Sequence, residues 1–97
     1  NENIFTIRND KFFQLIILQF FGISGNYVET KPLHGSQKGK WISPDVFEVN
    51  LELLQNYELE KLIISYGEDV LVVGPENLRK KISERLSKAV SLYRTDE

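Results

Sequence analysis

Hydrophobic and polar residues change their spacing several times along the chain, and each change marks an expected element. Residues 12–21 are apolar apart from two glutamines and rich in Ile, Leu and Phe, which predicts a strand buried on both faces of a sheet. A ten-residue helix is the alternative for this segment. Residues 46–54 alternate strictly between apolar and polar side chains, which predicts a half-buried strand. Residues 41–43 and a proline-aspartate turn precede that strand, so we expect a β-hairpin.

Helical spacing occurs in three other segments. Asn56 is a good N-cap, apolar residues recur at helical spacing over 57–66, and Gly67 follows where a left-handed residue ends a helix. Residues 27–30 allow one or two helical turns. Residues 76–93 predict a long amphipathic helix. Its apolar stripe consists of Leu78, Ile82, Leu86, Ala89, Val90 and Tyr93.

A short apolar run at 70–73 predicts a central strand. The expected order is therefore strand, short helix, strand, strand, helix, strand, helix. The first six elements match the ferredoxin-like (split βαβ) plan, in which two right-handed crossovers place both helices on one face of an antiparallel sheet. The predicted class is α+β, with the C-terminal amphipathic helix as an addition. Residues 1–11 predict a linker or an edge strand, and residues 12–97 predict one domain.

Composition excludes several classes of function. A chain of 97 residues fits one domain, and with no cysteine and one histidine it offers no disulfide, no cysteine nucleophile and no usual zinc site. The apolar run at 12–21 is about half of the roughly 20 residues that span a bilayer. Twelve basic against fourteen acidic residues give no charge signature of nucleic-acid binding. We expect no cofactor, and because methionine is absent we expect a piece of a longer protein.

Catalytic chemistry finds little support in the sequence. Glu68 and Asp69 are neighbours in a predicted turn, where solvated carboxylates are usual. The glycine-containing loop at 22–26 resembles, loosely, the loop after the first strand of acylphosphatases, but those enzymes place an arginine just beyond it. Here residues 27–30 contain no arginine. The predicted strand at 70–73 also lacks the aromatic residues with which such sheets bind RNA. We therefore expect no enzyme activity.

The loop after Lys31 holds the candidate binding residues. It contains the single histidine, and imidazole changes charge near neutral pH in general. A lone loop histidine is most often a hydrogen-bonded structural residue, and composition does not choose between that role and a sensor. The candidate effector-binding or interface residues are His34, Ser36, Gln37 and Lys38.

Several features of the chain together resemble the C-terminal extension (WCX) of WYL-domain transcriptional regulators. They are Pro32-Leu33-His34 with Ser36-Gln37, the alternating strand, Asn56-Tyr57-Glu58-Leu59 running to Ser65-Tyr66-Gly67, Asp69-Val70 with Val72, Pro75 and Leu78, and Tyr93. The resemblance covers about residues 12–93. It implies a ferredoxin-like module at the end of a bacterial, cytoplasmic regulator, behind a winged helix-turn-helix and a WYL domain with an Sm-like β-barrel.

The same resemblance implies the partners. These are the N-terminal WYL and helix-turn-helix domains of the same polypeptide, a second subunit in a homodimer, and a nucleic-acid-derived or other anionic effector. DNA would be contacted only through the N-terminal domain, and no membrane is expected. The leading hypothesis is an effector-sensing or dimerisation module that packs on a WYL domain or a second subunit through the helix-free sheet face or the edge beside residues 31–42. The alternatives are a stand-alone domain that binds a small molecule or oligonucleotide and, third, an acylphosphatase-like enzyme.

Overall fold

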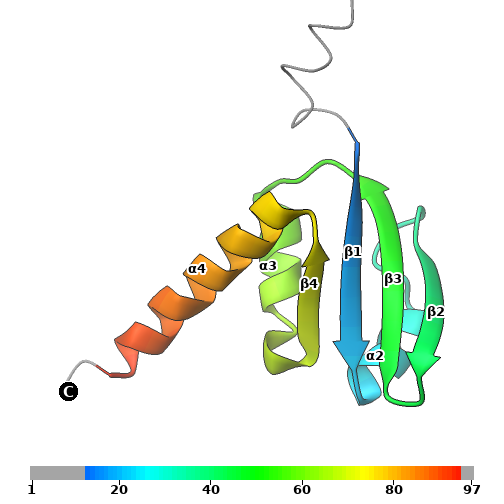
Figure 1. The fold of residues 1–97 in the computed structure, drawn as a ribbon, viewed down its shortest axis with the longest axis horizontal. Coiled ribbons are helices and arrows are strands. Elements are labelled where there is room, and N and C mark those ends of the chain that lie inside the picture. Colours follow the sequence, from blue (N-terminus) through cyan, green and yellow to red (C-terminus); the bar gives the residue numbers. More distant parts are fainter. Residues whose placement is uncertain (1–12, 95–97) are drawn as a thin grey trace, which may run out of the picture.

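The structure is a computed structural model that describes residues 13–94, and it confirms the expected α+β class and order of elements. The elements are β1 (Gln14–Phe21), α2 (Ile23–Thr30), β2 (Lys38–Ser43), β3 (Val46–Leu53), α3 (Tyr57–Ile64), a 3-10 turn (Gly67–Asp69), β4 (Val70–Gly74) and α4 (Glu76–Leu92). The four strands form one antiparallel sheet in the order β2-β3-β1-β4 (Figure 1). This order is compatible with the ferredoxin-like plan. The linker or edge strand predicted for residues 1–11 lies outside the described residues.

The core lies between one face of the sheet and the helices. Alternate residues of the central strand β1, namely Ile16, Leu18 and Phe20, have no exposed surface. All three α-helices contribute to the same cluster, so they cover the same face of the sheet. The buried core residues are Ile16, Leu18, Phe20, Val28, Phe47, Val49, Leu51, Leu59, Ile63, Val72, Leu78 and Ile82. None of the helices in the described range 13–94 is long and apolar enough to cross a membrane.

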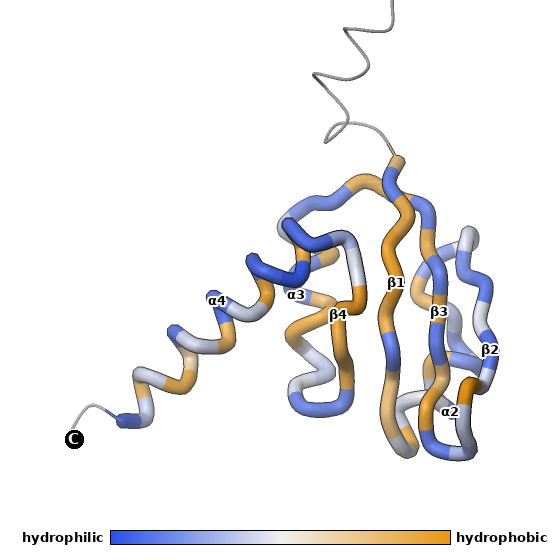
Figure 2. Tube along the Cα trace, in the orientation of Figure 1, coloured by the Kyte–Doolittle hydropathy of each residue, from blue (hydrophilic) through white to orange (hydrophobic). Residues whose placement is uncertain are grey.

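The prediction that the first strand is buried on both faces is wrong. Figure 2 shows β1 as hydrophobic along most of its length, yet within residues 13–94 only one of its faces is covered. Leu15 is 50% exposed, and Ile17 is only half-buried. The physical reason is that the helices all pack on the opposite face, which leaves an open sheet face on this side.

The prediction that residues 70–73 form a central strand is also wrong, because β4 is an edge strand beside β1. The crossover through α3 carries the chain from β3 past β1, which places β4 at the outside of the sheet. Val72 faces the core, whereas Leu71 and Val73 are each more than a third exposed. An uninterrupted apolar run therefore does not require neighbours on both edges.

The first helix begins earlier than predicted, at Ile23 instead of residue 27. Gly22 has φ +63°, a conformation that glycine adopts readily, and it turns the chain directly from β1 into α2. Gly25 has a packing role, because a Cβ there would lie 3.0 Å from Phe47 Cβ and 3.0 Å from the Trp41 ring. The sequence suggested a turn at this glycine, although its purpose is the close approach of α2 to the sheet.

The hairpin and the second helix agree with the prediction. β2 pairs with β3 and extends back to Lys38, which lies opposite Asn50. Asn56 caps α3, because its side-chain oxygen accepts a hydrogen bond from Leu59 N at 2.8 Å. Gly67 has φ +57°, as expected for a residue that ends a helical segment.

The last helix is only half covered. Leu78 and Ile82 are buried, but Leu86 and Val90 are 38% and 45% exposed, and Tyr93 is almost fully exposed. Figure 1 shows α4 leaving the sheet at an angle and projecting beyond the β4 edge. The predicted apolar stripe therefore exists, but its C-terminal half is only partly buried within the described residues.

Arg85 holds α4 against α3. Its Nη1 lies 3.1 Å from Glu60 Oε1, and its guanidinium carbon lies 5.0 Å from the centroid of the Tyr57 ring. Glu60 and Tyr57 are three positions apart on α3 and therefore lie on the same side of that helix. One side chain of α4 thus contacts both of them and joins the two helices.

Candidate functional site

Gln37 holds the predicted loop in place through both ends of its side-chain amide. Its Oε1 accepts a hydrogen bond from Leu33 N at 2.8 Å, and its Nε2 donates to Val28 O at 3.1 Å. Its backbone N donates to His34 O at 3.0 Å. The amide that the sequence suggested as a ligand donor therefore joins the loop to the end of α2.

His34 and Ser36 tie the same loop to β3. Ser36 N can only donate, so His34 Nδ1, at 3.1 Å, accepts, and the Ser36 hydroxyl 2.8 Å away donates to the same nitrogen. The lone pairs of Ser36 Oγ remain available, and one accepts from Glu52 N at 2.9 Å. These bonds assign the ring proton of His34 to Nε2, while the imidazole itself stays exposed.

The structure separates the fourth candidate, Lys38, from the other three. Lys38 begins β2 and lines a shallow depression of about 140 Å³ with Lys40, Glu48 and Asn50. This depression lies over the β2–β3 pair, where Lys40 is opposite Glu48 in the register. The four candidates are close in sequence but occupy three environments, and their role in binding stays a prediction.

His34 borders a hollow of about 200 Å³ that sequence reasoning missed. The loop, the end of β3 and α3 form its walls, which consist of Leu33, His34, Leu51, Leu53, Asn56, Glu58, Leu59 and Leu62. Its wall is mainly apolar, and its charged member is the carboxylate Glu58. The sequence signal for this hollow was the set of leucines at the end of β3 and on α3. Their strand and helix spacing predicted only that they belong to the core.

The open sheet face has an apolar half and a polar half. Its β1 and β4 part carries Leu15, Ile17, Phe21, Leu71 and Val73, which are exposed or half-buried. Its β2 and β3 part carries Lys38, Lys40, Glu48, Asn50 and Glu52. Gln19 joins the two halves, because its Nε2 donates to Glu48 Oε2 at 2.9 Å. An apolar patch bordered by polar residues is typical of a protein-interaction surface.

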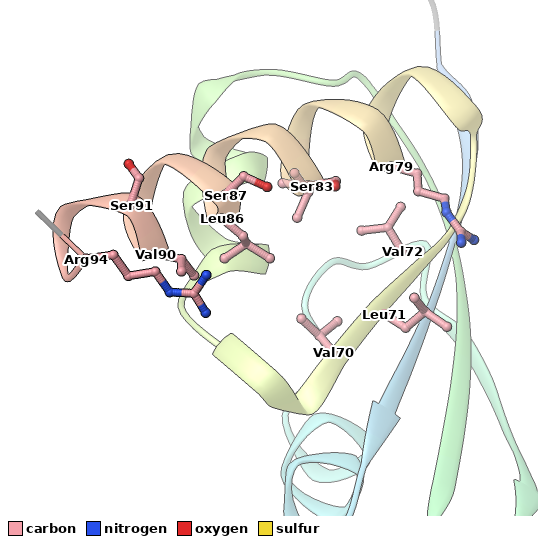
Figure 3. A pocket seen from close by; sticks show the side chains of 11 residues that line it. Val70, Leu71, Val72, Arg79, Ser83, Leu86, Ser87, Val90, Ser91 and Arg94 are labelled. Atoms are coloured by element: carbon pink, nitrogen blue, oxygen red, sulfur yellow. The ribbon is translucent and has the colours of Figure 1, made fainter. Parts of the chain in front are cut away.

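A larger groove, of about 650 Å³, lies between β4 and the projecting half of α4. Figure 3 shows Leu86 and Val90 pointing from the helix toward Val70, with Arg79 and Arg94 at opposite ends. Its wall is formed by Val70, Leu71, Val72, Arg79, Ile82, Ser83, Leu86, Ser87, Val90, Ser91 and Arg94. The sequence signal that was missed is the four-residue spacing of the three serines beside the apolar stripe.

The hydroxyl of Tyr66 has a structural environment rather than a reactive one. Burial raises the pKa of Tyr66 above its usual value, and the neighbouring Tyr27 raises it further. The hydroxyl therefore stays protonated at physiological pH. The ring makes an edge-to-face contact with Phe20 at 5.0 Å, which places it against the core. Residues 13–94 contain no group of three or more acidic or histidine side chains that could hold a metal ion.

These features define a small α+β domain with a hydrogen-bonded loop and partly exposed apolar surfaces. The chain matches the family model of the WCX domain over residues 24–90, which is more than half of its length. The chain therefore belongs to the WCX domain family. No curated protein matches it. The family expected from the sequence is confirmed, and it supports a C-terminal module of a WYL-family regulator at the level of the family.

Proposed function

We propose that this chain is the regulatory C-terminal module of a WYL-family transcriptional regulator, and that its open sheet face docks on the WYL domain of that regulator. Family membership supports the first part. The observation that carries the second part is the apolar half of the open face, where Leu15, Leu71 and Val73 are 50%, 39% and 37% exposed. This role is one of binding rather than catalysis.

The distribution of charge on the open face favours a folded partner. The apolar half lies over β1 and β4, and the charged residues of β2 and β3 lie along one side of it. Protein interfaces commonly have an apolar centre with a polar rim, and a neighbouring domain would cover both parts at once. Effector-dependent changes in this contact would then reach the rest of the regulator.

A pair of substitutions in the apolar half tests the docking. We expect Leu15→Lys with Val73→Lys to weaken binding of the chain to the separately produced WYL domain at least tenfold, because two ammonium groups would be desolvated. The matched control is Glu84→Lys, an equal change of charge on the exposed part of α4 outside the open face, which should leave the affinity within twofold. Isothermal titration calorimetry gives both values. Equal binding by the double variant and the control would contradict the proposal.

A second candidate function is effector binding at the hollow beside His34, and the favouring observation is an exposed imidazole next to an apolar cavity of about 200 Å³. Nucleotides and short single-stranded DNA are the first ligands to titrate, since the family resemblance implies an anionic effector. We expect His34→Ala to reduce binding, whereas Lys38→Ala, in a different depression, should not. Unchanged binding by His34→Ala would exclude this loop as the effector site.

A further inference from the structure

We propose that the groove between β4 and α4 binds an extended peptide of a partner protein, with apolar side chains at its centre and carboxylates at both ends. The peptide would add to the sheet as a fifth strand beside β4. This site shares Leu71 with the open sheet face and no residue with the His34 hollow, and it takes a different kind of partner, so the inference goes beyond the proposed function.

The first argument is the free edge of β4. Among the described residues this strand pairs only with β1, and its outer edge faces the groove. The unpaired N–H and C=O groups of an edge strand are a template for another strand. Peptide recognition by strand addition uses such an edge, with side-chain pockets supplying the selectivity.

The second argument is the layer of helices, which continues where the sheet ends. An added strand would lie about 4.8 Å beyond β4, and Figure 1 shows α4 projecting on that side. Leu86 and Val90 would contact its side chains and lose their exposure to water. Ser83, Ser87 and Ser91 are short, and the groove beside them has a volume of about 650 Å³. The fifth strand would therefore complete the two-layer packing over α4.

The third argument is charge. Arg79 and Arg94 are the charged side chains among the 11 that line the groove, and both are positive. They are fifteen positions apart, or about 22 Å along a helix, which corresponds to about seven extended residues. Acidic side chains of an added strand would be attracted to these guanidinium groups, whereas basic side chains would be repelled.

A second copy of the chain is the competing occupant, since residues 68–76 also carry acids on both sides of an apolar strand. Antiparallel pairing of two β4 strands keeps both sets of helices on the same face of the joined sheet. The second copy would bring its own α3 and α4 into the layer that α4 already occupies beyond β4. A peptide without attached helices meets no such conflict, so the geometry favours it.

The probe for the test is the blocked peptide Glu-Thr-Val-Thr-Val-Thr-Glu, with Lys-Thr-Val-Thr-Val-Thr-Lys as its matched control. In both peptides the end charges and the valines lie on the same face of an extended strand, the face that would meet α4. Titrated into the isotope-labelled chain, the acidic peptide should shift the amide NMR signals of β4 and of residues 83–91. It should bind roughly tenfold more tightly than the basic peptide, because two exposed ion pairs replace two repulsive contacts. Equal affinities, or shifts confined to the open sheet face, would overturn the proposal.

A charge reversal supplies the second arm. Arg79→Glu with Arg94→Glu should make the basic peptide the tighter ligand, and Lys88→Glu, outside the groove on the same helix, should leave the original preference within twofold. Sedimentation velocity of the chain without peptide measures whether a second copy occupies the groove by dimerisation. Dimerisation through β4 that excludes the peptide would overturn the proposal, and a monomer that binds the acidic peptide would support it.

Discussion

The two edge strands of the sheet differ in what lies beside them. β2 carries Lys38 and Lys40, and lysines on an edge discourage pairing with another chain. β4 is the uncharged segment Val70–Gly74, and it borders an apolar groove. The same sheet thus protects one edge and leaves the other suited to pairing. Both strands are edges by strand order, so the difference between them lies in their side chains and in the helix beside β4.

Packing behind the two edges differs as well. Behind β2, the Phe47 ring lies over Gly39 and its centroid is 4.9 Å from that of Trp41. Behind β4, Ile82 is buried, but Val90 lies in the open groove. The packing behind β2 therefore depends on the close fit of Gly39, Phe47 and Trp41. Behind β4, α4 is buried near Ile82 and exposed near Val90.

The largest effect should come from the covered part of the β4 edge. Ile82→Ala should lower the free energy of unfolding by about 3 kcal/mol, since it leaves a cavity in the core. Val90→Ala, two turns further along the same helix, should cost less than about 1 kcal/mol because that side chain is already 45% exposed. Urea unfolding followed by circular dichroism measures both. Similar losses for the two variants would show that the whole of α4 is packed.

The next effect tests the close fit behind β2. A Cβ at Gly39 would lie 2.2 Å from Phe47 Cζ, and the buried ring cannot move away without disturbing Trp41. Gly39→Ala should therefore lower the free energy of unfolding by about 2 kcal/mol. Gly74→Ala on β4 is the control, because no atom lies within 4 Å of its Cβ position, and it should stay within about 0.5 kcal/mol of wild type.

A smaller effect concerns the attachment of α4. Arg85→Ala removes the ion pair with Glu60 and the contact with the Tyr57 ring, and it should cost about 1 kcal/mol. Amide hydrogen exchange in the second half of α4 should become faster, whereas Lys88→Ala should change neither quantity. Unchanged exchange in Arg85→Ala would mean that the buried residues alone set the direction of the helix.

The smallest effect on stability should follow from removing the charges of the β2 edge. Lys38→Val with Lys40→Val should leave the free energy of unfolding within about 0.5 kcal/mol of wild type, since both side chains are exposed. The variant should nevertheless self-associate in sedimentation velocity experiments, because its edge no longer opposes strand pairing. A strictly monomeric variant would show that the two lysines do not prevent pairing at the β2 edge.

Local signals predicted most of the secondary structure. The cap at Asn56, the left-handed Gly67 and the alternation over 46–54 each depend on neighbours within a few residues, and the structure confirms all three. The start of α2 differs from the prediction because glycine, serine and asparagine over 22–26 are typical of a turn, whereas Gly25 packs against Phe47 and Trp41. Contacts between distant segments leave no local signal of this kind.

The candidate site was predicted less completely than the fold. The sequence identified the loop at 33–38, yet it gave no indication that Gln37 bonds to Val28 O or that Ser36 accepts from Glu52 N. The groove beside β4 was missed because the apolar stripe of α4 predicts a buried helix regardless of where the sheet ends. The sequence shows which hydrogen-bonding groups a side chain carries. The fold determines which other groups they bond to.

By itself the sequence determined the type and order of the elements, the class of fold and the resemblance to the family, because hydrophobic period, capping and turn chemistry act over short distances. Only the tertiary structure decided that, within residues 13–94, β1 is covered on one face, β4 lies at an edge and the C-terminal half of α4 stays partly exposed. These properties depend on where each crossover places its helix relative to the whole sheet. The spacing of apolar residues along the chain is the same whether a helix covers them or they remain exposed to water.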